Sequence, residues 1–100
     1  MVQATTPTFI LTLPNTVDLT LVDSLWFTLK QGSTIINKTG ESLVVEGQTV
    51  SVYLTQAETM QFYSGMARLQ LNLVYPDGSR ACSNIVPVEV GENLIKEVLE

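Results

Sequence analysis

The sequence predicts an all-β domain, most simply an antiparallel two-sheet sandwich of immunoglobulin-like outline, with an open barrel as the alternative. Two observations carry this prediction, and the length of the chain gives the number of domains. Apolar and polar residues alternate with a period of two along several stretches. Turn residues separate these stretches at short, regular intervals. The chain has 100 residues, so we expect one domain that covers residues 1–100.

The alternating stretches predict strands with one buried face and one mostly polar face. The clearest strands are 8–13, 25–30, 49–54 and 68–75, and the weaker ones are 17–21, 34–37 and 42–46. We expect the buried faces to include Phe9, Leu11, Phe27, Leu29, Val50, Val52, Leu69, Leu71, Leu73 and Val88.

A hairpin is predicted at Tyr75-Pro76-Asp77-Gly78-Ser79, because proline, aspartate and glycine suit successive positions of a tight turn. The return strand then covers 81–90 and contains Pro87. Proline has no N–H to donate, so one side of this strand should be an edge, or a bulge should interrupt it. Val86, Val88 and Val90 form its expected buried set.

One short helix should interrupt the strands at 56–63. Thr55-Gln56-Ala57-Glu58 matches a capping box, in which the first side chain caps the helix and the fourth reaches back. Gly65 then ends the helical stretch. Since this helix lies between two strong strands, we expect it to cross from one sheet to the other.

The last residues, 92–100, have a helical pattern instead, as a possible short C-terminal helix or tail. Leu94, Ile95, Val98 and Leu99 fall on one helical face. Nine residues are too few for a stable isolated helix, so the apolar stripe must pack against something. Its own sheet and another subunit are the two alternatives.

Composition argues against an enzyme and against nucleic-acid binding. The chain contains no histidine, the usual general base and commonest metal ligand, and its formal net charge is −5. Asn15, Asp18 and Asp23 could offer oxygen ligands to calcium, but their spacing matches no known calcium loop, and solvated or structural roles are favoured. We therefore expect no catalytic residue, no cofactor and no metal.

The single cysteine and the absence of long apolar runs bear on location. Cys82 cannot form an internal disulfide, which favours a cytoplasmic folding compartment and a role as a small strand residue. The sequence contains no signal peptide pattern and no apolar stretch that could span a membrane, so no membrane association is expected.

Three residues fall on the polar phase of their strands although they are apolar or aromatic. They are Trp26, Tyr53 and Val74. If they share an outer sheet face, they form an exposed patch of the kind that marks interfaces. Alternatively, a loop, the N-terminal arm or the C-terminal stripe covers them. Trp26 and Tyr53 could also stack on sugar rings, as in a carbohydrate-binding module or an adhesion domain that recognises a cell-surface glycan.

The second half of the chain carries a family resemblance. Its residues are Val50-x-Val52-x-Leu54-Thr55-Gln56-x-Glu58-Thr59, Phe62, Gly65, Leu69-x-Leu71, Tyr75-Pro76-Asp77-Gly78, Ser83 and Val88-x-Val90. Asp18-Leu19-Thr20 and Leu25-x-Phe27-x-Leu29-Lys30-x-Gly32 add to it. The pattern resembles small β-sandwich proteins of phage and prophage tails, and in particular is similar to the N-terminal domain of the upper baseplate protein family of phages with Gram-positive hosts.

The resemblance implies a non-enzymatic virion structural protein, a tail or baseplate component assembled in the cytoplasm of the bacterial host. Its expected partners are other tail or baseplate proteins and further copies of itself. Larger family members continue beyond the position of Val90, so the resemblance favours a stand-alone assembly protein, or one domain of a longer protein, over receptor binding here. The residues expected at interfaces are Trp26, Tyr53, Val74, Leu94, Ile95, Val98 and Leu99.

Overall fold

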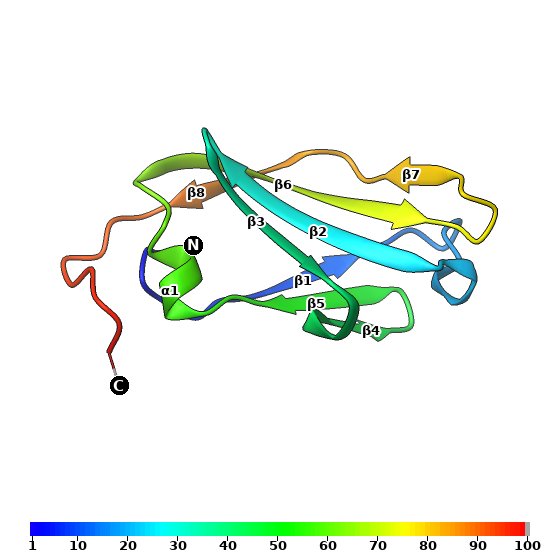
Figure 1. The fold of residues 1–100 in the computed structure, drawn as a ribbon, viewed down its shortest axis with the longest axis horizontal. Helices are drawn as coiled ribbons and strands as arrows, with labels where there is room; N and C mark the ends of the chain where they lie inside the picture. The colour runs from blue at the N-terminus through cyan, green and yellow to red at the C-terminus, as the bar shows by residue number, and fades with distance from the viewer. Residues whose placement is uncertain (100) are drawn as a thin grey trace.

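The computed structural model describes residues 1–99 and forms two antiparallel sheets packed face to face (Figure 1). In the described residues, one sheet has three strands in the order β1-β5-β4. The other has five, in the order β3-β2-β6-β7, with β8 also paired to β6. The strands are β1 (Thr8–Thr12), β2 (Ser24–Gln31), β3 (Thr34–Thr39), β4 (Leu43–Glu46), β5 (Thr49–Tyr53), β6 (Gly65–Val74), β7 (Arg80–Cys82) and β8 (Val86–Val90).

This strand order is that of an immunoglobulin-type sandwich. If β1 is equated with the second immunoglobulin strand, B, then β1-β5-β4 corresponds to B-E-D and β3-β2-β6-β7/β8 corresponds to C′-C-F-G. The first immunoglobulin strand has only a trace here, a parallel bridge between Val2 and Gly91. Within the described chain, β1 therefore pairs with β5 alone and forms one edge of its sheet.

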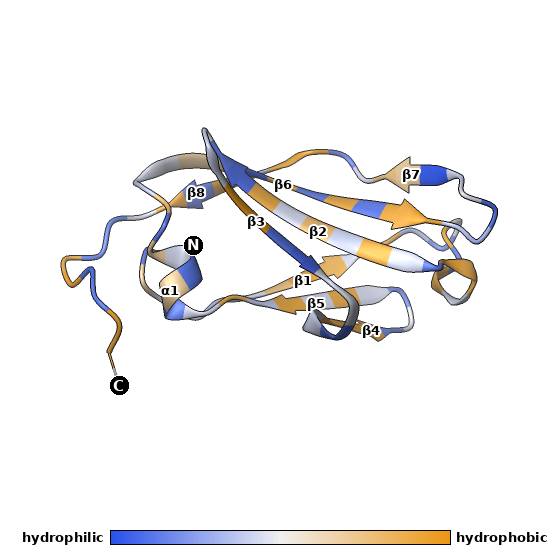
Figure 2. Ribbon diagram, in the orientation of Figure 1, coloured by the Kyte–Doolittle hydropathy of each residue, from blue (hydrophilic) through white to orange (hydrophobic). Residues whose placement is uncertain are grey.

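The core lies between the sheets and follows the predicted alternation, which Figure 2 shows along β2 and β6. The buried apolar residues are Leu13, Phe27, Leu29, Ile36, Leu43, Val50, Val52, Leu54, Phe62, Ala67, Leu69, Leu71, Leu73, Val88 and Val90. Phe9 and Leu11 were expected to be buried but are only partly so. They lie on the edge strand β1, where no further strand covers them.

Residues 17–21 do not form the predicted weak strand; Leu19–Leu21 is a 3₁₀ helix. The Asp18 carboxylate accepts hydrogen bonds from the Thr20 backbone N–H at 3.0 Å and from the Thr20 hydroxyl at 2.6 Å. Such local bonds satisfy the chain without a neighbouring strand, and so compete with sheet pairing.

The helix α1 (Gln56–Thr59) connects the two sheets, as predicted, but it is shorter than 56–63. Its capping box is present in both directions, between Thr55 and Glu58. The helix stops early because the following residues serve the core and the sheet: Phe62 is 2% exposed, and the Tyr63 N–H and C=O both bond the Gln31 side chain.

The predicted return strand 81–90 is divided into β7 and β8. Between them, the Ser83 hydroxyl accepts from the Leu71 N–H at 2.9 Å, so a side chain replaces a backbone partner. Pro87 lies in β8, which among the described strands pairs with β6 alone, and this confirms the edge prediction. Val88 and Val90 are buried, whereas Val86 is 43% exposed beside the break.

Of the two alternatives for residues 92–100, a short helix or a tail, the described part of the segment is a tail in the isolated chain. The described residues after Gly91 form no helix, and Leu94, Ile95, Val98 and Leu99 are all exposed. The segment is too short to be helical without a surface against its apolar stripe, and it does not pack on its own sheet. Glu100 lies outside the described residues. No helix in residues 1–99 is long and apolar enough to cross a membrane.

Candidate interaction surfaces

The three residues of the predicted outer patch do not share one face. Trp26 and Val74 lie on the outer face of the five-stranded sheet, where Ser24 pairs with Val74 and Trp26 pairs with Asn72. Tyr53 belongs to β5 and lies on the outer face of the other sheet. All three side chains lie on the outer face of a sheet, as predicted, but they do not form one shared patch. No sequence signal assigns a strand to one sheet or the other.

The C-terminal segment, residues 92–99, crosses one end of the sandwich (Figure 1). Asn93 holds its start, because its backbone N–H and side-chain amide donate to the Gln3 side-chain and backbone oxygens at 3.2 and 2.9 Å. Leu99 holds its end through two hydrogen bonds with the Gln56 side chain. These polar contacts fix the backbone while Leu94 stays 93% exposed.

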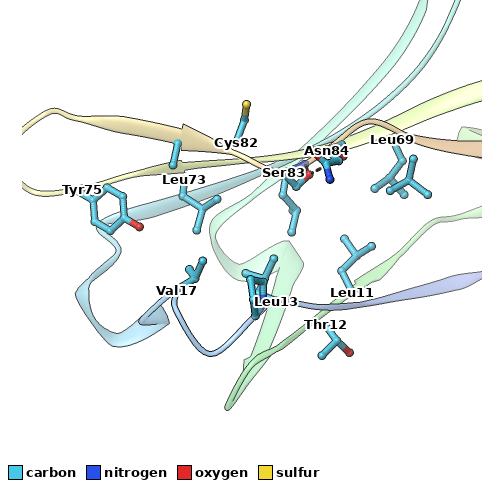
Figure 3. A pocket seen from close by; sticks show the side chains of 14 residues that line it. Leu11, Thr12, Leu13, Val17, Leu69, Leu73, Tyr75, Cys82, Ser83 and Asn84 are labelled. Atoms are coloured by element: carbon cyan, nitrogen blue, oxygen red, sulfur yellow. Dashed lines mark hydrogen bonds between the residues drawn. The ribbon is translucent and has the colours of Figure 1, made fainter.

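An apolar groove opens along the sandwich edge between β1 and the β7–β8 break. Its volume is about 410 Å³. In Figure 3, Leu11 from β1 and Leu13 just after it lie opposite Leu69 and Leu73 from β6, while the Cys82 side chain points away. The residues that line the groove are Leu11, Thr12, Leu13, Pro14, Val17, Leu69, Leu71, Leu73, Tyr75, Ala81, Cys82, Ser83, Asn84 and Val86, none of them charged.

The groove follows from two features of the fold. The edge of β1 has no strand beside it among the described residues, at the place that the first immunoglobulin strand would take. Across the gap, the chain forms no strand at residues 83–85, although Ser83 still bonds Leu71, so the facing edge is also interrupted. Sequence reasoning missed this groove, because its lining comes from segments far apart in the chain.

A second surface is the outer face of the five-stranded sheet, where three basic side chains of the described chain lie beside one exposed carboxylate, that of Glu89. Lys30 and Arg68 are direct cross-strand partners between β2 and β6, and Arg80 extends from β7 beside Val74. The other two cations of the chain are paired, Lys38 with Glu58 at 2.7 Å and Lys96 with Glu92 at 3.7 Å. Among the described residues, every lysine and arginine side chain outside an ion pair therefore lies on this face.

Two shallow hollows mark that face. The first, about 280 Å³, is lined by Trp26, Thr28, Asn37, Asn72, Val74 and Arg80. The second, about 200 Å³, is lined by Thr28, Lys30, Arg68, Leu69, Gln70 and Ile85. Thr28 lines both, so the hollows are neighbours.

Polar groups around Trp26 are fixed by bonds to each other. The Thr28 hydroxyl donates to Asn37 Oδ1 at 2.7 Å, and Arg80 Nε donates to Asn72 Oδ1 at 3.0 Å. Each bond occupies an amide oxygen and leaves the amide NH₂ to donate. The hollow therefore offers mainly hydrogen-bond donors to a ligand.

The acidic loop residues have structural roles where the contacts define one. Hydrogen bonds from Thr20 hold the pKa of the Asp18 carboxyl below its usual value, and those from Ser79 do the same for Asp77. Asp18 caps the 3₁₀ helix Leu19–Leu21, which is a structural role of the kind predicted for it in place of calcium binding. The described residues contain no group of three or more histidine, cysteine, aspartate or glutamate side chains placed to hold a metal. Cys82 is a free, exposed thiol in β7, consistent with a small strand residue.

Comparisons of the chain with protein-family models, curated proteins and solved structures gave no significant match. The fold itself defines the class of the protein, an all-β two-sheet sandwich with one short helix.

Proposed function

We propose that this chain is a non-enzymatic structural protein of a phage or prophage tail or baseplate, which acts through protein–protein assembly in the cytoplasm of the bacterial host. The observation that carries the proposal is the pair of apolar surfaces on one small sandwich. One is the uncharged groove along β1, and the other is the exposed C-terminal segment. Exposed apolar surface of this extent is typical of proteins that are covered by partners.

The family resemblance supports the same function. Its Thr55-Gln56-x-Glu58 stretch forms the capped connection between the sheets, and its Tyr75-Pro76-Asp77-Gly78 stretch forms the hairpin that leads into β7. In this proposal, other tail or baseplate proteins and further copies of the chain are the partners.

Purified particles test the proposal directly. The bacterium that carries the gene is given an epitope-tagged copy, and the phage particles are induced and separated on a density gradient. We expect the tagged chain in tail-bearing particles at a fixed ratio to the other tail proteins, and particles without complete tails after deletion of the gene. A chain that stays in the lysate while deletion leaves intact tails contradicts the proposal.

Recognition of a cell-surface glycan is a second candidate, favoured by the hollow around Trp26. The indole is 43% exposed and offers a flat apolar face to a sugar ring, with amide and guanidinium donors beside it. Lys30 and Arg68 are direct cross-strand partners with like charges. An anion bound between them would reduce their repulsion. We propose a glycan that carries carboxylate groups as the ligand of this face.

The chain contains one tryptophan, so its fluorescence reports on this site alone. We expect polygalacturonate oligosaccharides to change the emission, and Trp26→Ala or Arg68→Glu to remove binding measured by calorimetry. Tyr53→Ala, on the opposite sheet, is the matched aromatic control and should bind normally. Equal binding of neutral dextran, or stronger binding of poly-glutamate or oligo-dT, would rule out this ligand class.

A further inference from the structure

We propose that residues 92–99 of one copy fold into a short amphipathic helix in the apolar groove of a second copy. This inference rests on the assembly function proposed above and specifies its contact. It brings together the apolar residues of the C-terminal segment, which are exposed in the isolated chain, and the open apolar groove along β1.

The sequence of the segment has the pattern of an amphipathic helix, although the segment is not helical in the isolated chain. Leu94, Ile95, Val98 and Leu99 occupy positions i, i+1, i+4 and i+5, which lie on one helical face. Its charged side chains, Glu92, Lys96 and Glu97, fall outside that stripe. In an extended strand, by contrast, Leu94 and Val98 would flank Lys96 on one side, and Ile95 and Leu99 would flank Glu97 on the other. Only the helix presents the four apolar side chains without a charge between them.

The groove fits such a helix in chemistry. Its lining contains no charged residue, and Leu11, Leu69 and Leu73 present aliphatic surface to it. The free edge of β1 also needs protection, and a helix laid against a sheet edge is one way in which proteins protect it. An amphipathic helix in an apolar groove is a recurrent mode of recognition.

The groove that receives the segment belongs to a different copy. Hydrogen bonds with Gln3 hold Asn93 at the end of the sandwich, and Gln56 directs Leu99 along α1. The groove extends towards the opposite end, where Tyr75 and Val17 line it (Figures 1 and 3). Docking in a neighbour requires that the exposed bonds between Gln56 and Leu99 open, and also those between Asn93 and Gln3 where the helix begins at residue 92.

A contact between the segment of one copy and the groove of the next joins two different surfaces. Contacts of this kind are heterologous, and they generate closed rings or open filaments rather than symmetric dimers. The same contact repeated around an axis would place identical chains in a ring.

Light scattering of the full-length chain tests this contact with variants of each surface. The wild type is expected to self-associate as concentration rises. Leu94→Asp/Val98→Asp in the segment and Ala81→Glu in the groove should each weaken association at least about tenfold. Ala81 is exposed and lines the groove, so its substitution spares the core. Val86→Glu is a second groove variant, in case Ala81→Glu does not fold by circular dichroism.

Controls match each variant in chemistry. Lys96→Asp changes the charge of the segment by two units, as the double aspartate variant does, but on the polar face of the helix. Ile10→Glu places a carboxylate at an equally apolar position, 67% exposed, on the outer face of the three-stranded sheet. Both controls should associate like the wild type.

Mixing the two defective variants gives the sharpest result. The groove variant keeps an intact segment, and the segment variant keeps an intact groove, so together they can form one contact. We expect a 1:1 heterodimer that does not extend. In hydrogen exchange, residues 94–99 should be protected in the wild-type assembly and unprotected in Ala81→Glu.

A wild-type chain that stays monomeric at all concentrations overturns the inference, as does association that survives both variants or a mixture that stays monomeric. The assembly function is judged separately, by the presence of the chain in purified particles. A monomer found in particles would leave the function standing with a different protein as its partner.

Discussion

Buried polar side chains complete the backbone hydrogen bonding where the strands of this sandwich end. Gln31 is 3% exposed, and its amide donates to the Tyr63 carbonyl at 2.8 Å and accepts from the Tyr63 N–H at 2.9 Å. Thr59 is fully buried, and its hydroxyl donates to the Thr5 carbonyl. Each side chain takes the place of a backbone partner that no strand supplies, which lets the chain turn without leaving buried groups unpaired.

Replacing Gln31 by leucine should therefore destabilise the fold although it adds apolar volume. The Tyr63 N–H and C=O would both lose their partner, at a cost of about 2–4 kcal/mol in the free energy of unfolding. Urea denaturation measures this cost. Gln61→Leu is the matched control, because Gln61 is exposed, and it should change stability little. Equal stability of the two variants would contradict the role assigned to Gln31.

Glu58 makes stability depend on pH. Burial alone would raise the pKa of this carboxyl, but hydrogen bonds from Lys38 and the Thr55 N–H, with the Lys38 charge, lower it overall. A carboxyl with a lowered pKa in the folded state stabilises the fold above its unfolded pKa. This contribution is lost as pH falls through the acidic range below about 4.

Glu58→Gln should thus lose about 1 kcal/mol at neutral pH, where the Lys38 ion pair is removed but the side chain can still accept from Thr55. The difference from the wild type should close once the pH falls below the lowered folded-state pKa of Glu58, where both side chains are neutral. Urea melts at a series of pH values from neutral to strongly acidic check this, with the exposed Glu41→Gln as control. A difference that persists at low pH would show that the side chain acts through packing instead of charge.

At the scale of elements, strand β6 sets the register of the larger sheet. It pairs with β2, β7 and β8, and its alternate residues Leu69, Leu71 and Leu73 enter the core. Leu71→Asp would place a carboxylate among these side chains and should unfold the domain, because a buried unpaired charge costs as much as the whole stability of a small domain. Met66→Asp, on the exposed face of the same strand, should fold normally. Circular dichroism and thermal melts distinguish the two.

The strands could be predicted because a strand with one buried face has apolar residues at every second position, as in Leu69, Leu71 and Leu73. The strand predicted at 17–21 does not form, because the Asp18 carboxylate satisfies the backbone locally and a 3₁₀ helix replaces the strand. Trp26 and Tyr53 were placed outward correctly, yet their sheets depend on topology. For the surfaces, the sequence reveals the apolar C-terminal residues, but the groove and the Lys30–Arg68 pair arise only from long-range pairing.

At the scale of the whole molecule, the two proposed surfaces differ in charge. The chain has a net charge of −5, yet Lys30, Arg68 and Arg80 lie together on the outer face of the five-stranded sheet. The groove at the sandwich edge is lined by uncharged residues only. One surface can therefore attract an anion at short range, while the other can gain free energy only by covering apolar area.

Salt should consequently affect the two surfaces in opposite ways. Raising NaCl from about 0.05 to about 0.5 M shortens the screening length several-fold, so binding of polygalacturonate to the Trp26 face should weaken markedly. Self-association through the groove should not weaken, and sodium sulfate should strengthen it, because that salt favours burial of apolar surface. Light scattering and tryptophan fluorescence measure the two effects on the same sample. Self-association that dissolves in NaCl would mean that charged groups, and not the apolar groove, hold the copies together.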